Sequence, residues 1–149
     1  MTTMSVQLRS IPDTQAAMGW AEGHTIVVDR PDGQAGGMGL GFNGGQLLGL
    51  AIGGCFCNDL QYVAHDMGVR LASIEVDVMV AFEGSPLLAT QASMHVAVTA
   101  ADKSADVDSV IRRAKEICPS AIRSGAASRS TSSAASGLQI APRQQFFRL

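Results

Sequence analysis

The sequence predicts an α+β fold with antiparallel sheets. Three features predict it: short alternating segments before residue 30, one long apolar helical segment near the middle, and two long alternating segments after it. Hairpin-type connections without a strand–helix–strand rhythm favour antiparallel pairing. The expected order is βββ–α–ββ–α, to which residues 138–140 could add an edge strand. A length of 149 residues with 46% hydrophobic content suits one domain, residues 1–149.

The first thirty residues predict a meander of three strands. Apolar and polar residues alternate with a period of two, as in a strand with one buried face. The apolar positions of the first strand are Met4, Val6 and Leu8. Turn residues at 12–13 and 22–23 separate it from segments 18–20 and 24–29. A glycine-rich loop follows over 30–45, but it lacks the Gly-Lys-Ser/Thr ending of a nucleotide-binding loop.

A central helix is expected over residues 44–67. Asn43 can cap its start, and Gly68 stands where a left-handed residue would end it. The segment is apolar around most of its circumference, which predicts burial from more than one side. It also carries glycines at 49, 53 and 54, which are unfavourable in a helix. Their presence predicts a second helix packed very close, or a kink.

A hairpin and a second helix complete the predicted core. Residues 73–82 and 88–98 alternate around a turn at 83–86. Ser104 is the expected cap of the next helix, which Pro119 ends. The apolar face of this helix consists of Val107, Val110, Ile111, Ala114 and Cys118. The Ser/Ala run over 124–137 predicts a mobile loop.

Charge and hydropathy exclude several classes of partner. Eleven basic against 13 acidic residues give a net charge of -2, so a phosphate-binding basic face is not expected. The most apolar stretch, 47–57, is shorter than the ~20 residues that span a bilayer. We therefore expect neither nucleic acid nor a membrane as partner. No signal peptide is recognisable, and three cysteines cannot all pair, so a cytoplasmic location is expected.

The cysteines allow more than one interpretation by spacing alone. Cys55 and Cys57 are two residues apart on a helix and point about 200° away from each other, so they cannot bind one ion together. Cys57 is expected to be a small buried apolar residue. Cys55 and Cys118 could meet if the two helices pack side by side, but two inert core thiols fit the spacing better. A zinc site made from these cysteines and Asp59 is the weakest alternative.

Two motifs resemble those of the OsmC/Ohr family. One is the segment Asn43-Gly44-Gly45-Gln46-Leu47 leading to Cys55-Phe56, and the other is Glu116-Ile117-Cys118-Pro119. The resemblance extends over residues 25–119. It implies an intertwined homodimer in which two antiparallel sheets wrap central helices. It also implies thiol-dependent reduction of organic hydroperoxides, without a cofactor or metal.

The same resemblance assigns roles to the two cysteines. Cys55 would be the thiolate that attacks the O–O bond and becomes a sulfenic acid. Cys118 would resolve it as a disulfide, which an external dithiol then reduces.

The sequence departs from the family at the residues that activate the thiol. Gly44 and Gly45 occupy the positions of the family's Pro and Glu, and that Glu holds an activating arginine. Arg30 is the best substitute for the arginine, whereas Asp59, one turn after Cys55, would oppose a thiolate if charged. These departures leave an alternative: a catalytically silent dimer that binds a small apolar ligand.

Overall fold

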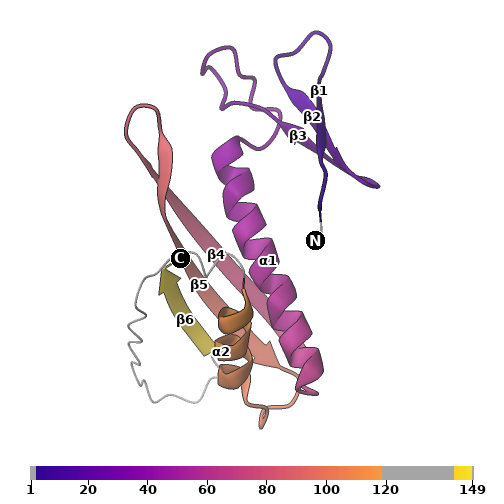
Figure 1. Cartoon of the computed structure of the whole chain (residues 1–149), viewed down its shortest axis with the longest axis vertical. Coiled ribbons are helices and arrows are strands. Elements are labelled where there is room, and N and C mark those ends of the chain that lie inside the picture. The colour runs from indigo at the N-terminus through magenta and orange to yellow at the C-terminus, as the bar shows by residue number, and fades with distance from the viewer. Residues whose placement is uncertain (1–2, 119–142, 149) are drawn as a thin grey trace. The chain divides into compact units, whose positions relative to one another are not determined.

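The computed structural model of this chain describes residues 3–118 and 143–148 and contains two antiparallel sheets and two helices (Figure 1). The elements are β1 (Gln7–Ser10), β2 (Ala17–Ala21), β3 (His24–Val28), α1 (Gly44–Asp66), β4 (Leu71–Glu83), β5 (Leu88–Ala100), α2 (Val107–Ile117) and β6 (Arg143–Arg148). This confirms the α+β class and the predicted order. The mobile loop predicted over 124–137 and the strand predicted over 138–140 lie outside the described residues. Strand β6, three residues later, has no counterpart in the sequence analysis.

The chain divides into two compact units, residues 1–48 and 49–149. The first unit contains the predicted meander, a sheet in the order β1-β2-β3. After β3, the Asp29 carboxylate accepts hydrogen bonds from the backbone N–H groups of Arg30, Met38 and Leu40, at 2.8, 3.0 and 3.1 Å. The bond from Leu40 is the largest influence that lowers the pKa of Asp29. The glycine-rich loop is thus tied to the end of β3 by one carboxylate.

Helix α1 begins at the predicted residue, Gly44, and ends at Asp66, one residue before the predicted end. The backbone N–H of Gln46 donates to Oδ1 of Asn43 at 2.9 Å, and Oε1 of Gln46 accepts from the backbone N–H of Asn43 at 2.9 Å. This reciprocal capping box satisfies donors that a helix start leaves unpaired. At the other end Gly68 has φ +67°, a left-handed conformation that glycine adopts without steric cost.

Within this chain α1 is buried on one face only, so one chain alone does not provide the predicted burial from more than one side. The buried residues are Gly53, Phe56, Leu60, Val63 and Ala64. On the opposite side Leu50 is 53% exposed and Tyr62 is 69% exposed. The reason is that, in the part of the chain that the structure describes, the buried cluster on α1 is completed by β5 and α2 alone.

The glycines of α1 do not mark a second helix at close range. A Cβ added at Gly53 would lie 3.1 Å from Cγ2 of Val78 on β4, and one at Gly54 would meet nothing within 4 Å. The close neighbour at Gly53 is therefore a strand. By length and composition alone α1 is also long and apolar enough to cross a membrane. A core helix passes the same test, and α1 packs its buried face onto the β4–β5 hairpin and α2.

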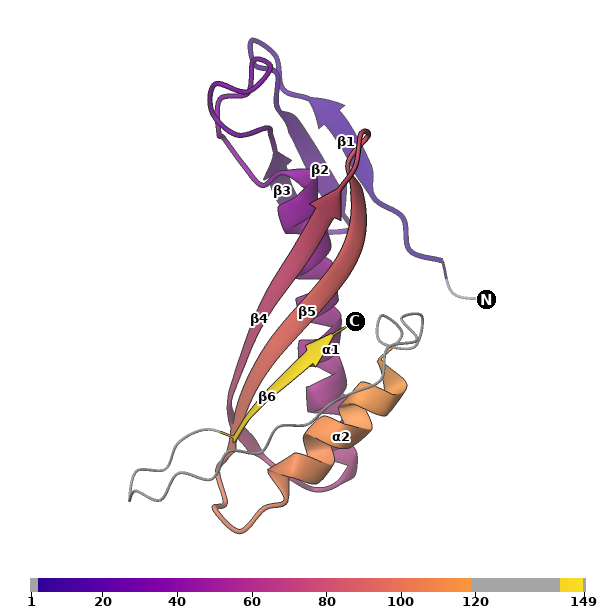
Figure 2. The same cartoon turned by 90° about the vertical axis from the view of Figure 1, so that its left-hand side faces the viewer.

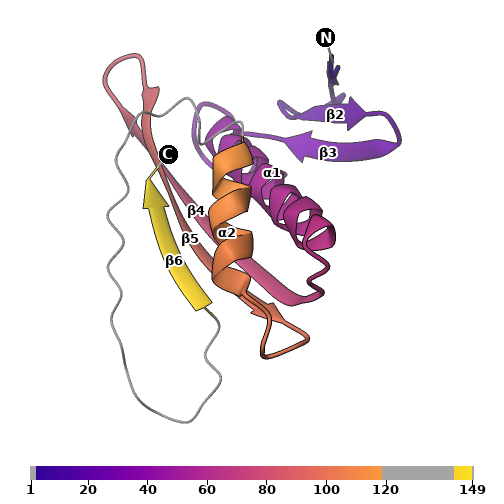
Figure 3. The same cartoon turned by 60° about the horizontal axis from the view of Figure 1, so that its bottom comes forward.

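The second unit has its core on one face of the β4-β5-β6 sheet. β4 and β5 pair in antiparallel register, with Val76 opposite Val96, and β6 pairs with the other edge of β5. Alternate residues of β5 face the same side, and α2 lies there beside the C-terminal half of α1 (Figures 2 and 3). The buried cluster comprises Phe56, Leu60, Val63, Ala64, Met94, Val96, Val98, Val107, Val110, Ile111, Ala114 and Cys118.

Helix α2 is capped by Asp106, which corrects the prediction of Ser104. Oδ1 of Asp106 accepts from the backbone N–H of Ser109 at 3.0 Å, and Oδ2 accepts from its hydroxyl at 2.5 Å. Ser104 instead bonds to Asp102, through its N–H at 2.8 Å and its hydroxyl at 2.7 Å. Ser104 lies three residues before Val107, too early to reach the unpaired N–H groups of the first turn.

Replacing Asp106 with alanine is expected to lower the free energy of unfolding by about 1 kcal/mol, because the N–H of Ser109 loses its acceptor. Ser104→Ala is the matched control and should change stability by less than about 0.5 kcal/mol. Urea unfolding followed by circular dichroism measures both variants. A larger loss for Ser104→Ala than for Asp106→Ala would contradict this assignment of the cap.

Candidate functional site

Cys55 lies near the middle of α1 with its side chain exposed. It shares the exposed face with Ala51, Asn58 and Tyr62, which are three or four residues apart and therefore line one side of the helix. Among the residues that the structure describes, none forms a hydrogen bond or an ion pair with Cys55. The thiol is therefore open to reagents that approach this face of α1.

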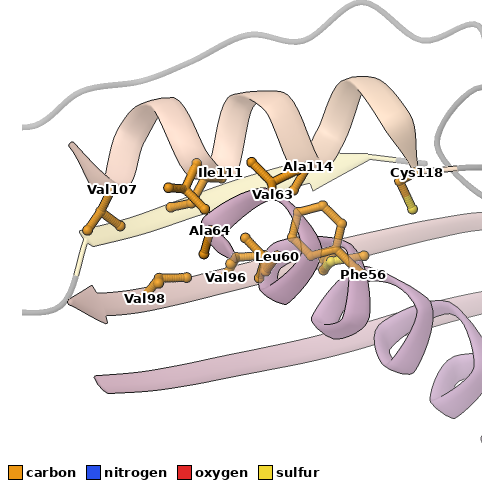
Figure 4. Close-up of a cluster of buried hydrophobic side chains, with 12 residues drawn as sticks. Phe56, Leu60, Val63, Ala64, Val96, Val98, Val107, Ile111, Ala114 and Cys118 are labelled. Carbon is orange, nitrogen blue, oxygen red and sulfur yellow. The ribbon is translucent and has the colours of Figure 1, made fainter. Parts of the chain in front are cut away.

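Cys118 occupies the opposite environment, in the buried core. It caps the C-terminal end of α2, where its backbone N–H donates to the carbonyl of Ala114 at 3.0 Å. Its exposed fraction is 0%, and it belongs to the same buried cluster as Phe56, the residue that follows Cys55 (Figure 4). The fold thus places Cys118 in the same core cluster as the residue next to Cys55. No disulfide joins any of the three cysteines.

Phe56 is a residue whose place in the site the sequence analysis missed. The sequence analysis names it only as part of the Cys55-Phe56 motif and predicts no role for it, yet it is covalently adjacent to one cysteine and packed in a cluster with the other. The signal that could have found it is the Cys-Phe step itself, since consecutive helix residues point about 100° apart and a large apolar residue next to an exposed cysteine can therefore face the core.

Cys57 differs from both of the other cysteines. It is half-buried, and burial raises the pKa of its thiol because a thiolate is poorly solvated there. At neutral pH the side chain is therefore a thiol rather than a thiolate. This agrees with the interpretation of Cys57 as a small apolar residue without a reactive role.

Arg30 is exposed and belongs to the first unit, residues 1–48. Its Nη2 donates to both the backbone carbonyl and the side-chain Oε1 of Gln15, each at 3.1 Å. These bonds join the loop after β3 to the turn before β2. The exposed position keeps the guanidinium able to exchange these neutral acceptors for an anion.

Asp59, also on α1, has a buried carboxylate oxygen without a hydrogen-bond partner among the described residues. It lies four residues after Cys55 and is partly buried. Its Oδ2 is inaccessible to solvent and accepts no hydrogen bond from any residue that the structure describes. Buried carboxylate oxygens usually have a partner, so this atom calls for a physical explanation.

The described ranges contain no group of three His, Cys, Asp or Glu side chains arranged to hold a metal ion. The zinc alternative therefore has no support there, because Cys55 is exposed while Cys118 is in the core. His95 lies on β5 opposite Asp77 of β4, with Nδ1 3.8 Å from Oδ2. The Asp77 side chain is 86% exposed and that of His95 38%, which is typical of a cross-strand pair at the surface.

Comparison with known families matches residues 36–125 to the family described as OsmC-like protein. The match covers more than half of the chain and includes both Cys55 and Cys118. No curated protein matches the sequence.

Solved structures share the fold at low sequence identity. An OsmC-like protein of unknown function from Vibrio cholerae has a TM-score of 0.70 at 12% identity, with 84% of this chain and 95% of that chain covered. An OsmC-like protein from Mycoplasma pneumoniae has a TM-score of 0.64 at 13% identity, covering 81% and 86%. An organic hydroperoxide resistance protein OsmC from Legionella pneumophila has a TM-score of 0.58 at 17% identity, covering 82% and 88%.

Proposed function

Because this chain belongs to the OsmC-like family, we propose that it is a thiol-dependent peroxidase that reduces organic hydroperoxides. The observation that carries the proposal is an exposed thiol, Cys55, next to Phe56, which packs in one cluster with the buried thiol of Cys118. The hydroperoxide resistance protein from Legionella pneumophila, which shares the fold, supports the choice of substrate class.

The proposed reaction begins at Cys55, whose thiolate attacks one oxygen of the hydroperoxide. An S–O bond forms, the O–O bond breaks, and the leaving alkoxide takes a proton to become an alcohol. The hydroperoxide is thereby reduced and Cys55 is oxidised to a sulfenic acid. The sulfur of Cys118 then attacks the sulfenic sulfur, which forms a disulfide and releases water. An external dithiol reduces this disulfide by thiol–disulfide exchange.

The difference in exposure supports this division of roles. A substrate in solution can reach the exposed thiol of Cys55, whereas the buried Cys118 is protected from direct oxidation. Since the attacking thiol must be an anion, a nearby cation is required, and we assign that role to Arg30. A reducing cytoplasm, in which both thiols are regenerated, is the matching location.

We also infer that the active form is a homodimer. Besides the exposed face of α1, the β4–β5 hairpin carries Met79, Leu87 and Leu88, which are all more than half exposed. Exposed apolar residues that form a contiguous patch mark an interaction surface. A second copy of this chain can cover them symmetrically, and at 16% the charged residues are few enough for a large interface.

The proposal predicts that the purified protein consumes cumene hydroperoxide when dithiothreitol is present. Without the reductant, one equivalent of hydroperoxide should convert Cys55 and Cys118 to a disulfide, because no other thiol regenerates the sulfenic acid. Loss of hydroperoxide measures the first result, and mass spectrometry of tryptic peptides measures the second. Unchanged hydroperoxide, with both thiols still reduced, would reject the peroxidase function.

A second candidate function is the catalytically silent dimer that binds a small apolar ligand. It is favoured by one observation, the glycine at position 45, where the family has the acid that holds the activating arginine. In this case hydroperoxide is not consumed, and a disulfide does not form after oxidant is added. The same experiment therefore separates the two functions.

A further inference from the structure

The two thiols of the proposed reaction have different surroundings within the second unit. Cys55 is exposed on α1, whereas Cys118 is 0% exposed and shares the core cluster with Phe56 (Figure 4). Consecutive helix residues point about 100° apart, so the side chain of Cys55 leads away from the core that Phe56 enters. The thiol of Cys118 is thus directed into the core and the thiol of Cys55 out of it.

A disulfide requires both residues to come to one place. The two sulfur atoms must lie about 2.05 Å apart and the two Cα atoms about 4.4–6.8 Å apart. Either Cys55 turns into the core, or Cys118 leaves it. The elements that carry the two cysteines differ in how easily they can move.

Helix α1 is the fixed partner. It runs over 23 residues, and the reciprocal bonds of Asn43 and Gln46 cap its start. Turning Cys55 inward would rotate the buried face of the helix out of the core. Phe56 and Leu60, which are 1% and 0% exposed, would then lose their contacts with β5 and α2.

The last turn of α2 is the movable partner. Asp106 caps the start of this helix, but at the other end Cys118 has φ -65° and ψ 115°, so the backbone has already left the helical conformation. The bond from the backbone N–H of Cys118 to the carbonyl of Ala114 belongs to a helix end, and such ends open at low free energy. Moving this turn withdraws one side chain from the edge of the buried face of α2.

We propose that the last turn of α2 is a redox-linked switch, closed on the core in the reduced protein and opened when Cys118 forms a disulfide with Cys55. The inference rests on the proposed function, which requires these two sulfurs to join. The sulfur of Cys118 attacks the sulfenic sulfur of Cys55, the S–O bond breaks, and the hydroxyl leaves as water with the thiol proton. Opening also brings the sulfur of Cys118, which solvent cannot reach in the reduced protein, to the external dithiol.

Hydrogen exchange followed by mass spectrometry tests the switch in the full-length protein. The disulfide form is prepared with one equivalent of cumene hydroperoxide and, separately, with diamide, which oxidises thiols without a peroxidase reaction. We expect the amides in the last turn of α2 to exchange about tenfold faster in the disulfide form than in the reduced form. A disulfide that forms without rearrangement restrains the chain and slows exchange. Unchanged or slower exchange in this turn therefore overturns the proposal.

Two cysteine variants are the controls for hydrogen exchange. In Cys118→Ala, adding oxidant should leave exchange in α2 unchanged, because no disulfide can form at that position. In Cys57→Ser the acceleration should remain at full size, because Cys57 takes no part in the disulfide. Acceleration in Cys118→Ala, or its loss in Cys57→Ser, would overturn the assignment of the switch to Cys118.

Glu116 offers a matched pair of variants for the rate of disulfide formation. It is exposed and lies in the last turn of α2. Glycine lowers helix propensity, so Cys118 should leave the core more often, and diamide should produce the disulfide about fivefold faster in Glu116→Gly than in Glu116→Ala. Both variants lose the same charge, so the comparison isolates the stability of the helix end. Equal rates, measured by alkylating the remaining thiols at timed intervals, would overturn the proposal.

The two oxidants separate this inference from the proposed function. If diamide but not hydroperoxide yields the disulfide, and exchange in α2 accelerates, the peroxidase function is rejected and the switch is kept. If hydroperoxide yields the disulfide without accelerating exchange, the switch is rejected and the peroxidase function is kept. If neither oxidant joins Cys55 to Cys118, both are rejected.

Discussion

Replacing Cys55 with serine is expected to reduce hydroperoxide consumption by roughly 1,000-fold or more. A serine hydroxyl has nearly the same shape as the thiol, but it does not ionise near neutral pH and cannot form a stable sulfenic acid. The exposed position of Cys55 means that the change removes chemistry without disturbing the core. The measurement is the initial rate of cumene hydroperoxide loss with dithiothreitol in excess.

Cys57→Ser is the matched control for this experiment. Burial raises the pKa of Cys57, so its thiol stays protonated at neutral pH and is a poor nucleophile. Its replacement should leave the rate of hydroperoxide consumption within about twofold, because removing a group that takes no part in the reaction does not slow it. Undiminished turnover in Cys55→Ser would remove Cys55 from the mechanism, and a large loss in Cys57→Ser would transfer the reactive role to that residue.

Replacing Leu60 with alanine is expected to lower the free energy of unfolding by about 3 kcal/mol. Leu60 is 0% exposed and lies in the cluster where α1 meets β5 and α2. Truncation removes buried methyl groups and leaves a cavity that the surrounding helices and sheet cannot fully close. Urea unfolding at a fixed protein concentration measures the loss, since the stability of an oligomer depends on concentration.

Leu40→Ala makes the same chemical change at a site that is 48% exposed and lies outside the surface assigned above to the homodimer. In the isolated chain it should change the free energy of unfolding by less than about 0.5 kcal/mol. Equal losses in the two variants would contradict the core described above, because burial of Leu60 would then contribute nothing measurable.

Most of the fold could be predicted because its signals are local. The alternation in β4 and β5 follows from the period of a strand, and the reciprocal bonds of Asn43 and Gln46 follow from residues three apart in sequence. Gly68 ends α1 because only glycine adopts its backbone conformation at low cost. None of these needs information from distant parts of the chain.

The structure differs from the sequence-based predictions where the outcome depends on neighbours that are distant in the chain or on the path of the backbone. Ser104 and Asp106 are both good capping residues, and only the path of the chain into α2 decided that Asp106 meets the first N–H groups. Composition shows that α1 is apolar but not which neighbours cover it, so it predicts burial from more than one side, whereas one chain by itself covers a single face. Strand β6 was missed because its pairing partner is β5, more than 40 residues earlier in the chain.

The sequence by itself determined the element order, the family and the identity of the three thiols, because these depend on periodicity and on motifs within a few residues. Only the tertiary structure decided how the thiols differ. Packing α2 onto α1 and β5 buried Cys118 in the cluster that contains Phe56. The same packing left Cys55 exposed to solvent and Cys57 half-buried. It also left Oδ2 of Asp59 buried without a hydrogen-bond partner among the described residues. Reactivity depends on solvation and on neighbouring charges, and both are set by contacts between residues distant in sequence.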